Sequence, residues 1–228
     1  MAVSKRTLWT STIGLKIIMA VSGLGLVGFV LFHMVGHLQL LTGGRDAYNA
    51  YAHFMYGLGG FLWVARAGLL GVIAVHVVSA VALKQRNDAA RPHAYAVYTP
   101  RASTPMSRWM FVTGVGVLAF VVYHLLHFTI GVAHPEHFAA LDAEGRRDVF
   151  GNFVYSFQNP LVFGLYAIAI VVLAMHLAHA CTSMFRTLGL MHGRFRAPLS
   201  KVGPSVAVVT AVGFLVPPLA CLLRLVTP

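Results

Sequence analysis

The chain has 228 residues, of which 58% are hydrophobic and only 10% carry a charge. A soluble domain is typically about one quarter charged, so this composition excludes a soluble globular, disordered, collagen-like or disulfide-stapled secreted protein. The net charge of +11 would suggest nucleic-acid binding in a soluble chain. With a mean hydropathy of +0.75, the basic residues must first be placed relative to a membrane. The sequence therefore predicts an all-α, polytopic membrane protein with one transmembrane domain over residues 1–228, and no nucleic-acid partner.

Five stretches are long and apolar enough to cross a bilayer, which requires about 20 residues in a helix. In chain order they cover residues 13–41, 60–83, 109–132, 161–185 and 202–226. The last stretch contains Pro217–Pro218, which we expect to break or kink its helix. The connections, including residues 45–54, are expected to be loops. The first four spans are predicted to form the functional bundle.

The connections between spans are alternately rich and poor in Lys and Arg. Twelve of the 17 Lys and Arg fall in the N-terminal segment and in the second and fourth connections, where Asp88 is the only acid. The opposite side carries the other five acids. Since cytoplasmic loops are enriched in Lys and Arg, this asymmetry predicts a cytoplasmic N-terminus and an external C-terminus. The basic side is also suited to docking the acidic surface of a soluble partner.

Histidine is costly inside a bilayer and is usually functional there. The predicted spans contain seven histidines: His33, His37, His76, His124, His127, His176 and His179. A helix rises about 1.5 Å per residue, so His33 and His124 lie about 25 Å from the basic residues at the cytoplasmic ends of their spans. His76 and His176 lie about 12–15 Å from theirs. The histidines therefore form two layers, and each layer receives histidines from two helices.

Two such layers suit two b-type haems, each held by one imidazole on either side of the iron. Three alternatives to haem binding are isolated hydrogen-bonding histidines, a zinc site and a proton relay. Zinc sites and proton relays usually recruit carboxylates or cysteines, and the spans contain almost none. Gly23, Gly114 and the glycines near them either clear space for a porphyrin or allow close helix packing. Spacing alone does not decide which member of His33/His37, His124/His127 or His176/His179 is a ligand.

Four segments resemble the single-chain, five-helix cytochrome b anchor of succinate dehydrogenases and fumarate reductases. They read KIIMAVSGLGLVGFVLFHMVGH (16–37), RDAYNAYAHF (45–54), FVVYHLLHFT (120–129) and FQNPLVFGLYAIAIVVLAMHLAHACTSMFRTLGL (157–190). The resemblance implies His76 and His176 as iron ligands of a proximal haem b, and His33 and His124 as iron ligands of a distal haem b. The roles of His37, His127 and His179 stay open.

The resemblance also implies a function in a bacterial inner membrane. Electrons would pass between an iron–sulfur subunit, docked with a flavoprotein on the cytoplasmic face, and a membrane quinone, expected to be menaquinone. The dicarboxylate site would lie in a partner chain, so this chain would be a non-flavin subunit of the enzyme. The alternative is a di-haem cytochrome b subunit of another membrane oxidoreductase, such as a hydrogenase or formate dehydrogenase.

The quinone site and the haem propionates have weaker candidates. His53 is the predicted quinone-binding residue because histidine is the residue type best suited to exchange protons at physiological pH, in a segment that also holds Tyr48, Asn49 and Tyr56. Arg108 and Lys16 lie near the cytoplasmic ends of ligand-bearing spans. They are candidates to bind haem propionates, and the alternative is snorkelling to lipid headgroups.

Overall fold

The computed structural model describes residues 9, 11–90 and 104–228 of the chain. It is 82% helical, and no strand occurs among these residues. Five helical segments are long and apolar enough to cross a membrane, as predicted: Thr12–Thr42, Gly60–Ala89, Pro105–Ile130, Pro160–Thr187 and Gly193–Leu222. The basic residues Lys5, Arg6, Arg91 and Arg101, which contribute to the predicted orientation, lie outside the described residues.

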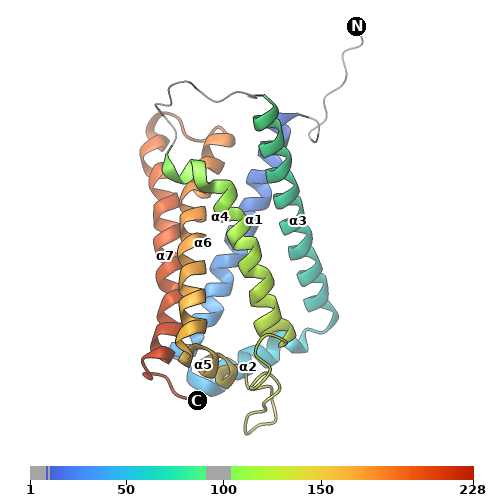
Figure 1. Cartoon of the computed structure of the whole chain (residues 1–228), viewed down its shortest axis with the longest axis vertical. Coiled ribbons are helices and arrows are strands. Elements are labelled where there is room, and N and C mark those ends of the chain that lie inside the picture. The colour runs from blue at the N-terminus through green and yellow to red at the C-terminus, as the bar shows by residue number, and fades with distance from the viewer. Residues whose placement is uncertain (1–8, 10, 91–103) are drawn as a thin grey trace.

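The long helices run side by side along the longest axis of the molecule (Figure 1). They are α1 (Thr12–Thr42), α3 (Gly60–Ala89), α4 (Pro105–His124), α6 (Pro160–Thr187) and α7 (Arg196–Leu222). Helix α3 packs on α1 and α4 packs on α6, while α7 covers α6 and α1. Apolar segments in lipid must satisfy their backbone hydrogen bonds internally, which makes the helix the default conformation of each span.

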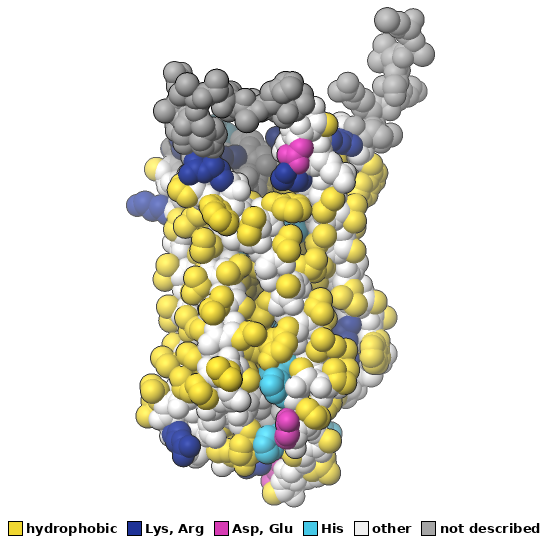
Figure 2. Space-filling view, viewed as in Figure 1, with side chains coloured by type: hydrophobic (Ala, Val, Ile, Leu, Met, Phe, Trp, Pro, Cys, Tyr) yellow, Lys and Arg dark blue, Asp and Glu magenta, His cyan; other side chains and the backbone are white. Residues whose placement is uncertain are grey.

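Local sequence signals set several helix ends. The hydroxyls of Ser11 and Thr104 accept hydrogen bonds from the first turns of α1 and α4, at 2.9 and 3.1 Å. Asn159 caps α6 in the same way, and Pro160 occupies the first turn of that helix. On the face shown in Figure 2, hydrophobic side chains cover the middle of the bundle, several Lys and Arg lie towards the end that bears the N-terminus, and His side chains lie towards the other end.

Two short helices lie across the end of the bundle that bears the C-terminus (Figure 1). Helix α2 (Gly44–Gly57) covers residues 45–54, so the prediction of a loop there was wrong. Helix α5 (Val149–Gln158) follows the loop after α4. Both are held by burial of part of their surface: α2 buries Tyr48 and Asn49, and most of α5 is buried. Short half-buried helices of this kind lack the long apolar signal of a span.

The fifth span is not broken at its proline pair, so of the two predicted outcomes only a kink remains. Helix α7 continues through Pro217 and Pro218, which are both buried, and ends at Leu222. It begins at Arg196, after the 3-10 turn η2 (Gly193–Phe195), and so starts earlier than expected. Prolines are tolerated within membrane-spanning helices because neighbouring helices and local adjustments can satisfy the backbone groups that they leave free. The third span ends in a six-residue π-helix, η1 (Leu125–Ile130), directly after α4.

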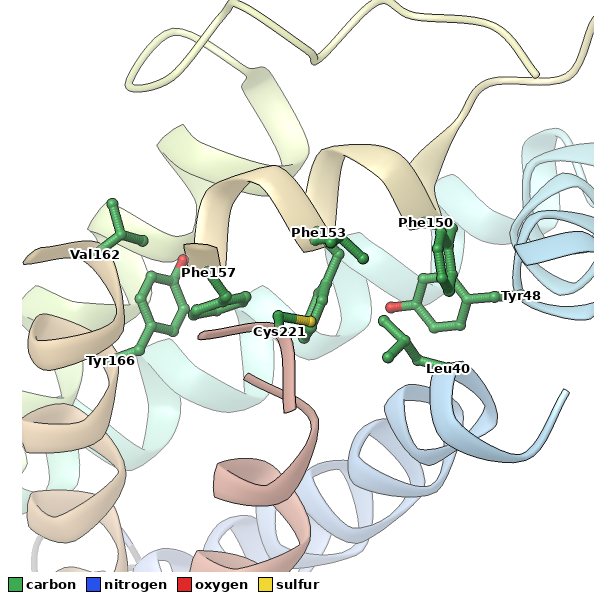
Figure 3. Close-up of a cluster of buried hydrophobic side chains, with 9 residues drawn as sticks. Leu40, Tyr48, Phe150, Phe153, Phe157, Val162, Tyr166 and Cys221 are labelled. Atoms are coloured by element: carbon green, nitrogen blue, oxygen red, sulfur yellow. The ribbon is translucent and has the colours of Figure 1, made fainter. Parts of the chain in front are cut away.

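An aromatic cluster joins the short helices to the ends of the long ones (Figure 3). Phe153 and Phe157 of α5 stand at its centre, with ring centroids 4.6 Å apart. Tyr48 of α2 and Tyr166 of α6 pack against them from opposite sides, with centroid distances of 6.3 and 4.9 Å. The cluster fixes α2 and α5 over the histidines at this end of the bundle.

Candidate functional site: two tiers of histidine

The histidine tier nearer the N-terminus is formed by α3 and α6. His76 Nδ1 lies 3.2 Å from Ser22 Oγ of α1, and His176 Nδ1 lies 3.2 Å from Thr113 Oγ1 of α4. The two imidazoles come from different helix pairs and are close enough to interact electrostatically. We call His76 and His176 the inner tier.

The hydrogen bonds of the Ser22 hydroxyl show which ring nitrogen of His76 carries the hydrogen. The Ser22 hydroxyl donates its one hydrogen to backbone carbonyls, Ile18 O at 2.8 Å and Met19 O at 3.1 Å. Its oxygen therefore accepts from Nδ1–H of His76. This arrangement leaves Nε2 of the neutral imidazole unprotonated, with its lone pair available to a metal.

Thr113 repeats this arrangement on the other helix pair. Its hydroxyl donates to Met110 O at 3.1 Å, so its oxygen accepts from Nδ1–H of His176. The same tautomer follows for His176, with Nε2 as the free donor nitrogen. Each inner-tier histidine is thus oriented by a hydroxyl from a neighbouring helix, as metal-binding histidines commonly are.

The second tier lies towards the C-terminus and joins α1 to α4. The rings of His33 and His124 are perpendicular, with centroids 5.8 Å apart. Two imidazoles on opposite sides of one metal, at metal–nitrogen distances of about 2.0–2.1 Å, place their centroids about 6 Å apart. We call His33 and His124 the outer tier.

A buried hydrogen-bond chain orients His124. The Ser156 hydroxyl donates to Asn152 O at 2.6 Å, so it accepts from His127 Nε2 at 3.0 Å. Nδ1 of His127 then accepts from Tyr166 OH at 2.9 Å. The Tyr166 oxygen is left to accept from His124 Nδ1 at 3.4 Å. Nε2 of His124 is consequently the unprotonated nitrogen, as in the inner tier.

His33 is held differently from the other three. Its Nε2 lies 3.2 Å from Nε2 of His37, and His37 Nδ1 lies 2.8 Å from Tyr48 OH. His33 must turn away from His37 before this nitrogen can bind a metal. The structure thus brings both His33 and His37 to the outer tier, and it connects His37, but not His33, to α2.

The glycines beside the inner tier pack against the histidine-bearing helices. A Cβ at Gly23 would lie 3.3 Å from Cε1 of His76, and one at Gly114 would lie 3.4 Å from Cε1 of His176. These glycines allow α1 and α4 to approach the imidazoles closely. Gly28 and Gly71 instead face open space, which is compatible with clearance for a large flat group.

A repeated sequence explains the matching geometry of the two helix pairs. Residues 22–33 read SGLGLVGFVLFH and residues 113–124 read TGVGVLAFVVYH. In both segments a hydroxyl residue and the glycine after it lie next to an inner-tier histidine. The histidine eleven residues after the hydroxyl residue belongs to the outer tier. Ser22 and Thr113 were not among the predicted site residues, although alignment of the chain with itself would have found them.

The remaining candidates lie away from the tiers or at their edges. Lys16 and Arg108 are exposed at the end of the bundle bearing the N-terminus, and their proposed contacts with haem propionates remain predictions. His53 is exposed on α2, and its role with quinone remains a prediction. His179 is half-buried on α6, three residues after His176.

An ionic network fastens α2 to the segment that precedes α5. Asp148 is 3% exposed and accepts hydrogen bonds from Arg45 at 2.6 Å, Asn49 at 2.9 Å and the Gly151 N–H at 3.1 Å. Burial opposes ionisation of Asp148, but these donors outweigh it and lower the pKa of the carboxyl. Burial raises the pKa of nearby Tyr48, whose hydroxyl stays protonated beside His37. The network therefore positions α2 and Tyr48 at the outer tier.

No family model matches this chain, and searches of curated proteins and of solved structures each found no match. Among the described residues, no group of three or more His, Cys, Asp or Glu side chains can hold a metal ion. Paired imidazoles can hold a metal only when another group supplies the remaining ligands, as a porphyrin does with its four nitrogens.

Proposed function

We propose that the chain is the membrane-anchor and electron-transfer subunit of a succinate:quinone oxidoreductase and binds two b haems. The observation that carries the proposal is the pair of histidine tiers, in which hydroxyl partners leave Nε2 of His76, His176 and His124 free. Ordinary helix packing does not require three imidazoles in the same tautomer on three different helices. Zinc sites use three or four protein ligands, and no group of three suitable side chains occurs among the described residues, so the paired imidazoles favour a haem over a zinc ion.

The proposed roles follow from the positions of the residues. His76 and His176 would hold one haem, and His33 and His124 the other. A bound b haem supplies reversible one-electron transfer. Ser22, Thr113 and Tyr166 would keep the ligand nitrogens oriented, and the surrounding apolar helices would exclude water. Two haems at different depths would carry electrons across much of the bilayer.

The charge distribution supports the proposed orientation and partners. Basic residues gather at the end of the bundle that bears the N-terminus (Figure 2), which would face the cytoplasm by the positive-inside rule. A flavoprotein and an iron–sulfur subunit would dock on this face and exchange electrons with the inner-tier haem. Menaquinone would react near the outer tier, in a bacterial inner membrane.

Purification of the intact complex, with haem quantified per chain, tests the proposal. We expect two b haems per chain and co-purification of a flavoprotein with an iron–sulfur protein. His76→Ala and His176→Ala should each remove the same haem, and His33→Ala and His124→Ala the other. His192→Ala, on the loop before α7, is the control and should retain both.

Three results would count against the proposal. A colourless preparation would refute haem binding. If variants from different tiers, such as His76→Ala and His124→Ala, removed the same haem, the assignment of the histidines to two tiers would be refuted. Co-purification with a hydrogenase or formate dehydrogenase subunit would be consistent with haem binding but would assign the chain to a different enzyme.

A further inference from the structure

Arg66 places a positive charge inside a membrane span. It lies in the second turn of α3, about 9 Å along the helix from its start, within the apolar segment Gly60–Ala89. A charged side chain in a span is costly and usually has a partner that compensates its charge. Since no Asp or Glu occurs between Asp46 and Asp88, that partner does not come from α3 itself.

The acidic side chains of the chain are all engaged elsewhere or exposed. The chain has six Asp and Glu, and all six are among the described residues. Five of them form ion pairs with basic residues other than Arg66: Asp46, Asp88, Asp142, Glu144 and Asp148. The sixth, Glu136, is exposed on the loop after η1 and forms no ion pair with Arg66. The negative charge that compensates Arg66 therefore comes from outside this polypeptide.

The guanidinium of Arg66 lies on the lipid-facing surface of the bundle. Its Cζ is 5.0 Å from the centre of the Trp63 ring, and Trp63 is 68% exposed. Helix α3 buries only Ser79 and Leu83, which both lie in its other half. Helical side chains tilt towards the N-terminal end of their helix, so the charge of Arg66 is brought closer to the start of α3.

The start of α3 lies at the membrane surface. Phe61 and Trp63 are 69 and 68% exposed, and exposed aromatic side chains gather at the level of the lipid headgroups. Helix α2, which leads into α3, lies across the end of the bundle (Figure 1). The turn between α2 and α3 leaves open space, because a Cβ would meet nothing within 4 Å at Gly57, Gly59 or Gly60. A headgroup beside Arg66 therefore has room.

We infer that Arg66 binds the phosphate of an anionic phospholipid, with Trp63 beside the headgroup. A guanidinium can donate two parallel hydrogen bonds to a phosphate. The acyl chains would lie along the exposed apolar side chains of α3, which include Val64, Leu70 and Val78. The lipid would belong to the leaflet at the end of the bundle bearing the C-terminus, which is the external leaflet in the proposed orientation.

Charge and position favour this ligand over other anions. A zwitterionic phospholipid would bring its own positive group close to Arg66, whereas an anionic phospholipid leaves a net negative charge to compensate it. Free inorganic phosphate has no apolar part to contact α3. A haem propionate is disfavoured because the outer tier joins α1 to α4, whereas Arg66 stands over an exposed ring on α3. The inference uses none of the histidines and so goes beyond the proposed function.

Native mass spectrometry of the full chain in detergent measures lipid binding directly. The delipidated chain is titrated with phosphatidylglycerol or with phosphatidylcholine, and we expect tighter binding of the first phosphatidylglycerol. Arg66→Gln should weaken that binding about fivefold, the size expected for one Arg near a membrane surface. Arg66→Lys keeps the charge and should retain the preference for phosphatidylglycerol. Equal binding of the two lipids by the wild type would overturn the inference.

Arg224→Gln is the matched control for the loss of one arginine. Arg224 is exposed just after α7, outside the span that ends at Leu222, and it forms no ion pair with a described acid. Its replacement should leave binding of the first phosphatidylglycerol unchanged. Equal weakening by Arg66→Gln and Arg224→Gln, or no weakening by either, would refute a site at Arg66.

Thermal unfolding in nanodiscs tests the site in a bilayer. A ligand that binds the folded state raises the melting temperature. Changing the lipid from phosphatidylcholine to phosphatidylglycerol should therefore stabilise the wild type and Arg224→Gln more than Arg66→Gln. In phosphatidylcholine alone, Arg66→Gln should melt no lower than the wild type. An equal loss of stability in both lipids would show that Arg66 serves helix packing and would overturn the inference.

Two further measurements distinguish the source of the anion and separate this inference from the proposed function. Excess inorganic phosphate should not displace phosphatidylglycerol, and displacement would overturn the lipid site. Loss of outer-tier haem from Arg66→Gln, with unchanged lipid binding, would identify a haem propionate as the partner instead. A haem-free chain that still prefers phosphatidylglycerol would refute the di-haem function and support the lipid site.

Discussion

Replacing Thr113 by Val tests whether a hydroxyl orients His176 for metal binding. Valine has nearly the shape of threonine, but it cannot accept the hydrogen bond from His176 Nδ1, which spans 3.2 Å in the structure. Thr113 is only 8% exposed, so little water can replace the lost acceptor. The change therefore leaves the Nδ1–H of His176 without a partner.

The expected magnitude follows from that unpaired donor. A buried polar group left without a hydrogen bond costs about 1–3 kcal/mol, and every 1.4 kcal/mol corresponds to a tenfold change in affinity. For the haem proposed at the inner tier, we expect the affinity to fall about 10- to 100-fold, the range typical for loss of a partner of a metal-binding histidine. The outer-tier haem should be retained.

The assay measures haem per chain after extended washing in detergent, together with the midpoint potential of each haem. Thr113→Ser should restore binding because it keeps the hydroxyl. Thr182→Val on α6 is the matched control, since the Thr182 hydroxyl donates to Ala178 O at 3.3 Å and forms no hydrogen bond with a described histidine. Equal haem content in Thr113→Val and Thr182→Val would refute the reasoning, and so would equal loss of both haems from Thr113→Val.

Two further predictions concern stability, measured as melting temperature in detergent. The lowered pKa of Asp148 means that its ionisation stabilises the fold above the ordinary pKa of 3.8 and that this contribution is lost as the pH falls through the lower folded value. Asp148→Asn should therefore melt below the wild type at pH 7, and the gap should narrow as the pH falls below 3.8; a constant gap would contradict this. Gly203→Ala should destabilise the protein by about 1–3 kcal/mol, because its Cβ would lie 2.2 Å from the backbone oxygen of Ala178. Gly68→Ala, which meets nothing within 4 Å, is the control, and equal melting temperatures would show that α6 and α7 are not closely packed there.

The spans were predictable because their signal is local. A segment in lipid has to satisfy its own backbone hydrogen bonds, so apolar length alone predicts a helix. The predicted first, second and fourth spans agree with α1, α3 and α6 at their starts to within one residue. The same local reasoning did not decide between a break and a continuous helix at Pro217–Pro218, since the neighbouring helices that tolerate a proline pair are not visible in the sequence of one helix.

The short helices were not predictable by the same means. Helix α2 exists because Tyr48 and Asn49 are buried against partners far away in the chain, including Asp148 and Phe150. These contacts depend on the third span returning the chain to the same end of the bundle. The segment 45–54 by itself carries no apolar run, and we therefore expected a loop.

Sequence by itself determined the helical class, the number of spans and the position of each histidine along its span, because hydropathy and helical rise act along one chain segment at a time. Only the tertiary structure decided which hydroxyl meets which imidazole. It paired Ser22 with His76, Thr113 with His176 and Tyr166 with His124, and so selected the nitrogen of each ring that is free for a metal. Hydrogen bonds across helices depend on rotation and contact between separate helices, and neither is encoded in the hydropathy of a single span.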